Sequence, residues 1–87
     1  MTTFPTQPTL SKLFRLQWEE VQNNYVLLYP EGMVKLNQSA AEILKRCDGK
    51  RDATAIVSDL ENSFALSDLR ADVEEFLHTA HAQGWIR

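Results

Sequence analysis

The stretch YPEGMVKLNQSAAEILKRCDGKR, which runs from Tyr29 to Arg51, decides the fold. Pro30-Glu31-Gly32 predicts a tight turn, and the short run Met33-Val34-Lys35-Leu36 predicts a strand. Asn37 then predicts the start of a helix, because its side chain can accept from the free amides of a first turn. Asp48-Gly49 predicts the end of that helix. Its apolar stripe, at helical spacing, comprises Ala40, Ala41, Ile43, Leu44 and Cys47.

Two more strands are expected before this stretch. Phe14-Arg15-Leu16-Gln17-Trp18 alternates apolar and polar residues, which is the period of a half-buried strand. Tyr25-Val26-Leu27-Leu28-Tyr29 is apolar on both faces, as expected for a central strand. The polar segment between them ends in Asn23-Asn24, which favours a turn. The three runs predict an antiparallel meander with Met33–Leu36 at one edge.

Two more helices are expected after it. The second begins at Asp52 or Thr54, either of which can cap it. The third is expected to be capped by Ser67 and to end at Gly84, after which Trp85-Ile86 folds back onto the core. Its apolar stripe comprises Leu69, Val73, Phe76, Leu77 and Ala80. Three strands followed by three helices predict an α+β domain, a meander and a three-helix bundle that resembles a winged helix-turn-helix.

Length and composition fit one domain of this kind. The 87 residues hold two prolines and four threonines among the first nine, so we expect a flexible tail over residues 1–9 and a domain over residues 10–87. No apolar run approaches the roughly 20 residues of a membrane span, and the N-terminus lacks the features of a secretory signal. Cys47 is the single cysteine, which suits a reducing compartment and a buried core position. We therefore expect a cytoplasmic protein.

Charge argues against nucleic acid as a partner. The formal net charge is −3 and the pI about 5.2, whereas nucleic-acid binders carry a basic surface. The predicted third helix sets Arg70 among four carboxylates, at Asp68, Asp72, Glu74 and Glu75, which would repel a phosphate backbone. A winged-helix DNA-binding regulator stays an alternative only because of the fold. The same acidity disfavours binding to anionic lipid.

Catalysis and metal binding find little support. Glu74, His78 and His81 share one helical face, but the sequence offers no fourth zinc ligand beside them. Neither a glycine-rich phosphate loop nor a nucleophile elbow is present. We expect no enzyme activity, no metal and no cofactor.

The edge strand is the feature that points to binding. Strand alternation places Val34 and Leu36 on one face and Met33 and Lys35 on the other. An edge with free backbone groups can accept an extended peptide as a fourth strand, beside a helix. The third helix is the expected neighbour. The residues alone leave equal room for an edge that a helix or a tail merely covers. An open edge could also pair weakly with a second copy, so we expect a monomer or a weak homodimer.

Several short pieces of the sequence, in this order and at this spacing, resemble the PqqD family. They are Tyr25–Gly32 (YVLLYPEG), Val34–Asn37 (VKLN), Ala40–Leu44 (AAEIL), Cys47–Gly49 (CDG), Ile56 with Leu60, and Gly84–Ile86 (GWI). The match runs from about Leu10 to the end of the chain.

The resemblance implies a peptide chaperone in the biosynthesis of the redox cofactor pyrroloquinoline quinone (PQQ). PqqD-like proteins bind the ribosomally made precursor peptide PqqA and present it to the radical S-adenosylmethionine enzyme PqqE, which links a glutamate to a tyrosine within the peptide. They are the prototype of the recognition elements for ribosomally synthesised and post-translationally modified peptides (RiPPs). The alternative is therefore a leader-peptide recognition domain that serves another RiPP-modifying enzyme.

In such domains the leader peptide adds to the third strand and lies against the third helix. The resemblance thus implies a peptide-binding set of Met33, Val34, Lys35 and Leu36 on the strand and Leu69, Arg70, Val73, Glu74 and Leu77 on the helix. Lys35 and Arg70 are expected to read acidic residues of the peptide. For Leu69, Val73 and Leu77, packing in the core is an equally good explanation of their apolar character.

Overall fold

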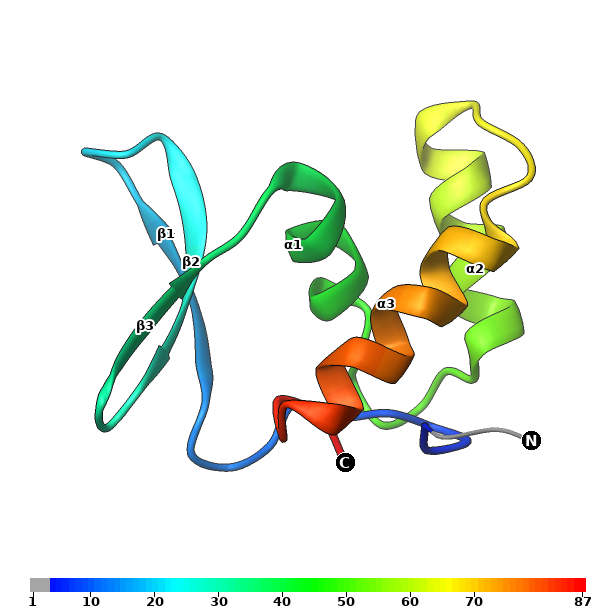
Figure 1. Ribbon diagram of the computed structural model, residues 1–87. Helices are drawn as coiled ribbons and strands as arrows, with labels where there is room; N and C mark the ends of the chain where they lie inside the picture. Colours follow the sequence, from blue (N-terminus) through cyan, green and yellow to red (C-terminus); the bar gives the residue numbers. More distant parts are fainter. Residues whose placement is uncertain (1–3) are drawn as a thin grey trace.

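A computed structural model describes residues 4–87 and contains three strands followed by three helices (Figure 1). The strands are β1 (Arg15–Glu19), β2 (Asn24–Tyr29) and β3 (Gly32–Lys35). The helices are α1 (Gln38–Lys45), α2 (Ala53–Phe64) and α3 (Arg70–Ala82). Both the order and the α+β class agree with the sequence prediction.

The sheet is the expected antiparallel meander, in the order β1-β2-β3. Central β2 is the most buried strand, and Val26 and Leu27 are fully enclosed. Two residues, Pro30 and Glu31, separate the pair Tyr29 and Gly32, which closes the second hairpin. Strand β3 has no partner on its outer side among the described residues, so it forms an open edge of the sheet.

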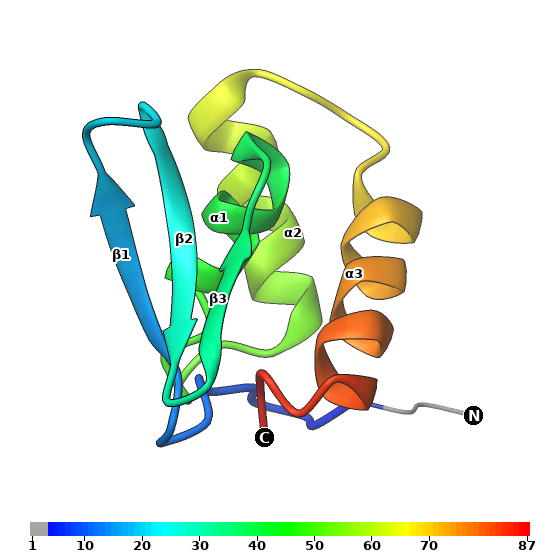
Figure 2. The same ribbon diagram turned by 60° about the vertical axis from the view of Figure 1, so that its left-hand side comes forward.

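Helix α1 lies between the sheet and the other two helices (Figure 2). It contacts β1 and β2 on one side and α2 on the other, while α3 packs on α2. One continuous core results, to which every helix contributes. Its buried members are Leu27, Leu36, Ala41, Ile43, Leu44, Cys47, Ile56, Val57, Leu60, Val73, Leu77, Ala80 and Ile86. Helix α1 ends at Lys45, before the predicted end at Asp48-Gly49, so Cys47 follows the helix. Cys47 is nevertheless buried in the core, as predicted.

Side-chain caps start the first two helices. The Asn37 carboxamide oxygen accepts from the amide of Ala40 at 2.8 Å, which confirms the predicted cap of α1. At α2 the sequence left two candidates, and the structure selects Asp52, whose carboxylate accepts from the amide of Ala55 at 2.8 Å.

The predicted cap of α3 at Ser67 is wrong. Helix α3 begins after Leu69, and no side chain caps it. Asp68 adopts a left-handed φ of +60°, which interrupts any helix that starts at Ser67. The amide of Leu69 donates instead to the carboxylate of Glu61 at 3.1 Å, from the preceding helix. A long-range partner has therefore replaced the local cap.

A flexible tail is expected over residues 1–9, and the part of it that the structure describes makes defined contacts. Met1–Thr3 lie outside the described residues, Phe4 packs on His78, and the chain near Thr9 runs beside the C-terminal end (Figure 1). Thr9 and Arg87 exchange two backbone hydrogen bonds of 2.9 Å, and buried Pro8 accepts from the amide of Gly49 at 3.0 Å. Proline and threonine suit an extended segment of this kind, and its partners lie too far along the chain to leave a local signal.

Candidate functional site

The backbone of β3 offers hydrogen-bonding groups at two positions. The amide of Leu36 donates to the carbonyl of Tyr25 at 3.2 Å. Residues along an antiparallel ladder alternate between exchanging such bonds and facing away. The pairs Val34 with Leu27 and Gly32 with Tyr29 therefore face inward. The N–H and C=O groups of Met33 and Lys35 point outward from the sheet and supply two donors and two acceptors at its edge.

The side chains of β3 alternate as predicted. Leu36 is buried in the core and Val34 is half-buried against it. Met33 and Lys35 lie on the other face, where Met33 is 45% exposed. The strand thus anchors the sheet through one face while its edge and the other face stay accessible.

A groove of about 260 Å³ is lined by residues of β3, α1 and α3. Figure 2 shows the backbones of β3 and α3 between which it lies. We call it the edge groove. Strand β3 forms one wall, the first turns of α1 form the floor, and α3 with the C-terminal segment forms the other wall. Its lining residues are Val34, Lys35, Leu36, Asn37, Ser39, Ala40, Ile43, Asp72, Phe76 and Trp85. Three of the four expected strand residues, Val34, Lys35 and Leu36, thus line one hollow.

The face of α3 that lines the edge groove differs from the expected one. Asp72 and Phe76 line it, and the Phe76 ring packs on Trp85 with 6.3 Å between ring centroids. Arg70 and Glu74 lie on the side of α3 toward α2: they pair with each other at 3.0 Å, and Arg70 donates to the Thr54 hydroxyl of α2 at 3.0 Å. The guanidinium of Arg70 thus has partners on the α2 side of α3, and the contact of Arg70 with acidic peptide residues stays a prediction.

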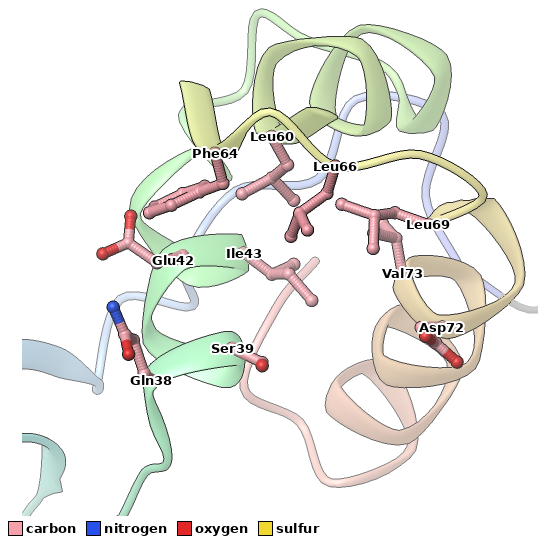
Figure 3. A pocket seen from close by; sticks show the side chains of 10 residues that line it. All are labelled: Gln38, Ser39, Glu42, Ile43, Leu60, Phe64, Leu66, Leu69, Asp72 and Val73. Carbon is pink, nitrogen blue, oxygen red and sulfur yellow. The ribbon is translucent and has the colours of Figure 1, made fainter. Parts of the chain in front are cut away.

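The other expected residues of α3 divide between the core and a second hollow. Leu77 is fully buried and belongs to the core. Leu69 and Val73 line a hollow of about 250 Å³ among α1, α2 and α3, which we call the helical pocket (Figure 3). Its other lining residues are Gln38, Ser39, Glu42, Ile43, Leu60, Phe64, Leu66 and Asp72. Leu77 thus belongs to the core, whereas Leu69 and Val73 line accessible space in the helical pocket.

Lys35 and Asp72 are the charged residues among those that line the edge groove. Within residues 4–87 neither takes part in an ion pair or a side-chain hydrogen bond. Glu42, at the rim of the helical pocket, is different, because it binds Arg46 at 2.9 Å and Lys45 at 3.0 Å. Burial raises the pKa of Glu42, but these hydrogen bonds outweigh burial and hold the pKa below its usual value. Among the charged residues that line the two hollows, Lys35 and Asp72 therefore have no ion-pair partner within residues 4–87.

Sequence reasoning missed part of the groove lining. The floor residues Ser39, Ala40 and Ile43 were expected only as parts of a capped, amphipathic helix. Phe76 and Trp85 were expected in the core, and both are only half-buried. The available signal was Phe76, a large aromatic residue at the border of the apolar stripe of α3. Its position does not show which element of the fold lies beside that border.

Glu74 and His78, which share one face of α3, have structural partners. His78 packs edge-on against the ring of Phe4, with centroids 5.0 Å apart, and Glu74 pairs with Arg70. Across the part of the chain that the structure describes, no three His, Cys, Asp or Glu side chains are grouped to hold a metal ion. No helix within residues 4–87 combines the length and the apolar character that a membrane span requires.

Comparison with known proteins places this geometry in context. A family model described as coenzyme PQQ synthesis protein D (PqqD) matches residues 24–86. A protein of Methylococcus capsulatus named PqqA binding protein is 53% identical over 78 residues, which cover 90% of this chain and 84% of that protein. A PqqA binding protein of Azotobacter vinelandii is 54% identical over 86 residues, which cover 98% and 94%.

A solved structure agrees with the fold over almost the full length. It is the solution NMR structure of the PqqD truncation of Methylobacterium extorquens PqqCD, described as a functional and stand-alone RiPP recognition element. The TM-score is 0.81 at 28% identity, and the alignment covers 99% of this chain and 96% of that one. The meander and the three helices are thus shared with a peptide-recognition element.

Proposed function

The chain belongs to the PqqD family, and from that premise we propose that it binds the precursor peptide PqqA and presents it to PqqE during PQQ biosynthesis. Two relatives with more than half of their aligned residues identical carry the name PqqA binding protein, which supports PqqA as the ligand. Residues 10–87 make up the proposed recognition domain, onto which residues 4–9 dock.

The peptide adds to β3 as a fourth strand of the sheet. The observation that carries this proposal is the open edge of β3 beside a groove, with the backbone groups of Met33 and Lys35 directed outward. Lys35 and the half-buried Val34 lie where a peptide in the groove would contact them. Asp72 and Phe76 are the groove-facing residues of α3, and they replace Arg70 and Glu74 in the set proposed to touch the peptide.

The size of the edge suits a carrier that must release its cargo. Four outward backbone groups give at most four hydrogen bonds to a peptide, each worth roughly 1 kcal/mol. Apolar contacts in the groove add to them, while the ordering of a flexible peptide opposes both. A few backbone bonds that are partly offset by ordering favour moderate affinity. Moderate affinity allows transfer of PqqA to PqqE, which must reach the glutamate and the tyrosine of the peptide.

A titration of isotope-labelled protein with synthetic PqqA, followed by amide NMR, tests the proposal. We expect shifts at Met33–Lys35 and at Asp72 and Phe76 of the opposite wall, and little change at β1, on the far edge of the sheet. Unchanged spectra at PqqA concentrations well above micromolar would contradict peptide binding. Addition of PqqE to the labelled complex then tests presentation, which requires that PqqE broaden the bound-state signals without displacing PqqA.

The same open edge sets the expected oligomeric state. We propose a monomer, or a weak homodimer that forms when two β3 edges pair. Because such a dimer would occupy the backbone groups of β3 to which PqqA is proposed to bind, PqqA should dissociate the dimer. Sedimentation velocity with and without PqqA measures this, and a dimer that persists with the peptide bound would show that the two copies meet elsewhere.

A further inference from the structure

The helical pocket is an apolar site with an open mouth. Six of its lining side chains are aliphatic or aromatic (Figure 3). Two of them, Phe64 and Leu66, remain 40% and 55% exposed, although both are large enough to belong in a core. Apolar surface gathered around a hollow in this way is the usual mark of a binding site.

The wall that carries Leu66 is held in place rather than loosely attached. Ala65 and Asp68 have left-handed φ angles of +53° and +60°, a conformation that residues other than glycine adopt at a cost. Glu61 fixes this connection at two points: its carbonyl accepts from the amide of Leu66 at 3.0 Å and its carboxylate from the amide of Leu69 at 3.1 Å. The strained segment thus keeps Leu66 at the mouth of the pocket.

The helical pocket continues the edge groove. Ser39, Ile43 and Asp72 line both hollows. In Figure 3 Ser39 and Asp72 lie on the side of the pocket opposite Leu60 and Phe64, and Ile43 lies between. Strand β3 runs toward this junction, because Lys35 is followed by Leu36, by the cap Asn37 and by the first turn of α1. A peptide that extends past the Leu36 end of the strand therefore arrives at the pocket.

Resting on the proposed function, we propose that the helical pocket binds one aliphatic or aromatic side chain of PqqA, placed N-terminal to the residues that pair with β3. The direction follows from pairing: an added strand that runs antiparallel to β3, like the rest of this sheet, has its N-terminal side at Leu36. The pocket thereby sets both the register of the peptide and its selectivity.

The dimensions of the pocket favour a single side chain over a broad partner surface. The polar residues Gln38, Ser39, Glu42 and Asp72 border about 250 Å³ of largely apolar space on the side opposite Leu60 and Leu66. A buried apolar anchor within a polar rim is the arrangement in which few residues carry most of the binding energy. The peptide backbone can lie along the rim while one side chain enters.

The test combines a protein variant with a peptide series. Leu66→Ser removes part of the pocket wall, and Leu13→Ser, at a side chain that is 70% exposed and lines neither hollow, is the matched control. PqqA variants carry alanine at each aliphatic or aromatic position in turn. We expect Leu66→Ser to weaken PqqA binding about 10-fold and Leu13→Ser to leave it within twofold. One PqqA variant, with alanine at a position N-terminal to the pairing segment, should bind the wild-type protein about 10-fold more weakly than PqqA does. The same alanine change should weaken binding to Leu66→Ser little further, because the pocket contact is already lost.

The outcomes separate this inference from the proposed function. If PqqA shifts the amides of Met33–Lys35 but Leu66→Ser binds it as tightly as the wild type, strand addition stands and the pocket does not hold an anchor. If the alanine change whose effect disappears in Leu66→Ser lies C-terminal to the pairing segment, the antiparallel direction of the peptide is wrong. If wild-type protein shows no shifts at β3 with PqqA, the proposed function itself fails. Urea unfolding of both variants verifies that each is folded.

Discussion

The backbone amide of Leu36 donates a hydrogen bond of 3.2 Å to the carbonyl of Tyr25, and this bond fixes the phase of the ladder between β2 and β3. Because alternate residues of an antiparallel pair face inward, the phase separates Val34, which holds the sheet together, from Met33 and Lys35, which face the open edge. Proline substitutions can distinguish these two roles, since proline lacks the backbone donor.

Lys35→Pro is expected to weaken PqqA binding about 10-fold and to change stability little, because proline is tolerated on an edge strand when its missing N–H faces outward. Val34→Pro should destabilise the domain by about 3 kcal/mol, because it removes an inward donor to β2. Isothermal titration and urea unfolding measure the two effects. Lys35→Thr keeps the backbone donor, and it should retain more affinity than Lys35→Pro. Equal affinities for the two would argue against strand addition.

Charge in the edge groove should act through Lys35. Lys35→Glu is expected to reduce PqqA affinity about 10-fold at low salt, and the reduction should shrink at high salt because screening shortens the reach of the charge. Lys12→Glu changes the net charge equally at an exposed position that lines neither hollow, so it controls for the overall field. A comparable loss with Lys12→Glu would trace the effect to net charge alone.

Arg70→Ala should affect stability rather than binding. The guanidinium joins Glu74 and Thr54, and the Arg70 and Glu74 side chains stay 50% and 38% exposed, so we expect a loss of only about 0.5 kcal/mol in the free energy of unfolding. PqqA affinity should stay within twofold of the wild type. A 10-fold loss of affinity in the same titration would return Arg70 to the peptide-binding set.

The caps of the helices give a direct measurement of where each helix starts. Asn37→Ala and Asp52→Ala should each cost about 1 kcal/mol, because each removes the acceptor for a first-turn amide. Ser67→Ala is the matched comparison and should change stability by less than about 0.5 kcal/mol, since α3 begins after Leu69. Urea unfolding provides all three values, and a cost of about 1 kcal/mol at Ser67 would place the start of α3 earlier.

Cys47 should make stability fall in alkaline solution. Burial, with a smaller contribution from the charge of Asp48, raises the pKa of this thiol from 9.0 to about 12. Between those values the unfolded chain releases a proton that the folded protein keeps. The free energy of unfolding should therefore decline by about 1.4 kcal/mol per pH unit through this group.

Comparison with Cys47→Ala isolates that contribution, because all other ionisations are common to both proteins. The variant should be somewhat less stable at pH 7, where it leaves a small cavity, and should show a shallower decline above pH 9. Parallel stability profiles would indicate that the thiolate is accommodated in the folded state.

Local patterns predicted much of this protein. The alternation in Phe14–Trp18 and the apolar run Tyr25–Tyr29 placed two strands, and Asn37 marked the first helix to the residue. These predictions succeed because strand period, helix period and capping depend on neighbours a few positions apart. Where a distant partner intervened, local signals failed: Glu61 binds the amide of Leu69, and Arg87 pairs with Thr9.

In the candidate site, too, local sequence predicted some features and tertiary packing decided others. The sequence alone predicted a short edge strand over Met33–Leu36, which the structure places at Gly32–Lys35, and an amphipathic third helix, because alternation and helical spacing are local properties of the chain. Tertiary structure alone decided which border of that helix meets the groove. Arg70 and Asp72 are two residues apart and flank the same apolar stripe, so no periodicity distinguishes them. The packing of α3 on α2 turned Arg70 toward Thr54 and Asp72 toward β3, because a helix fixes the angle between its side chains but not the neighbours that they meet.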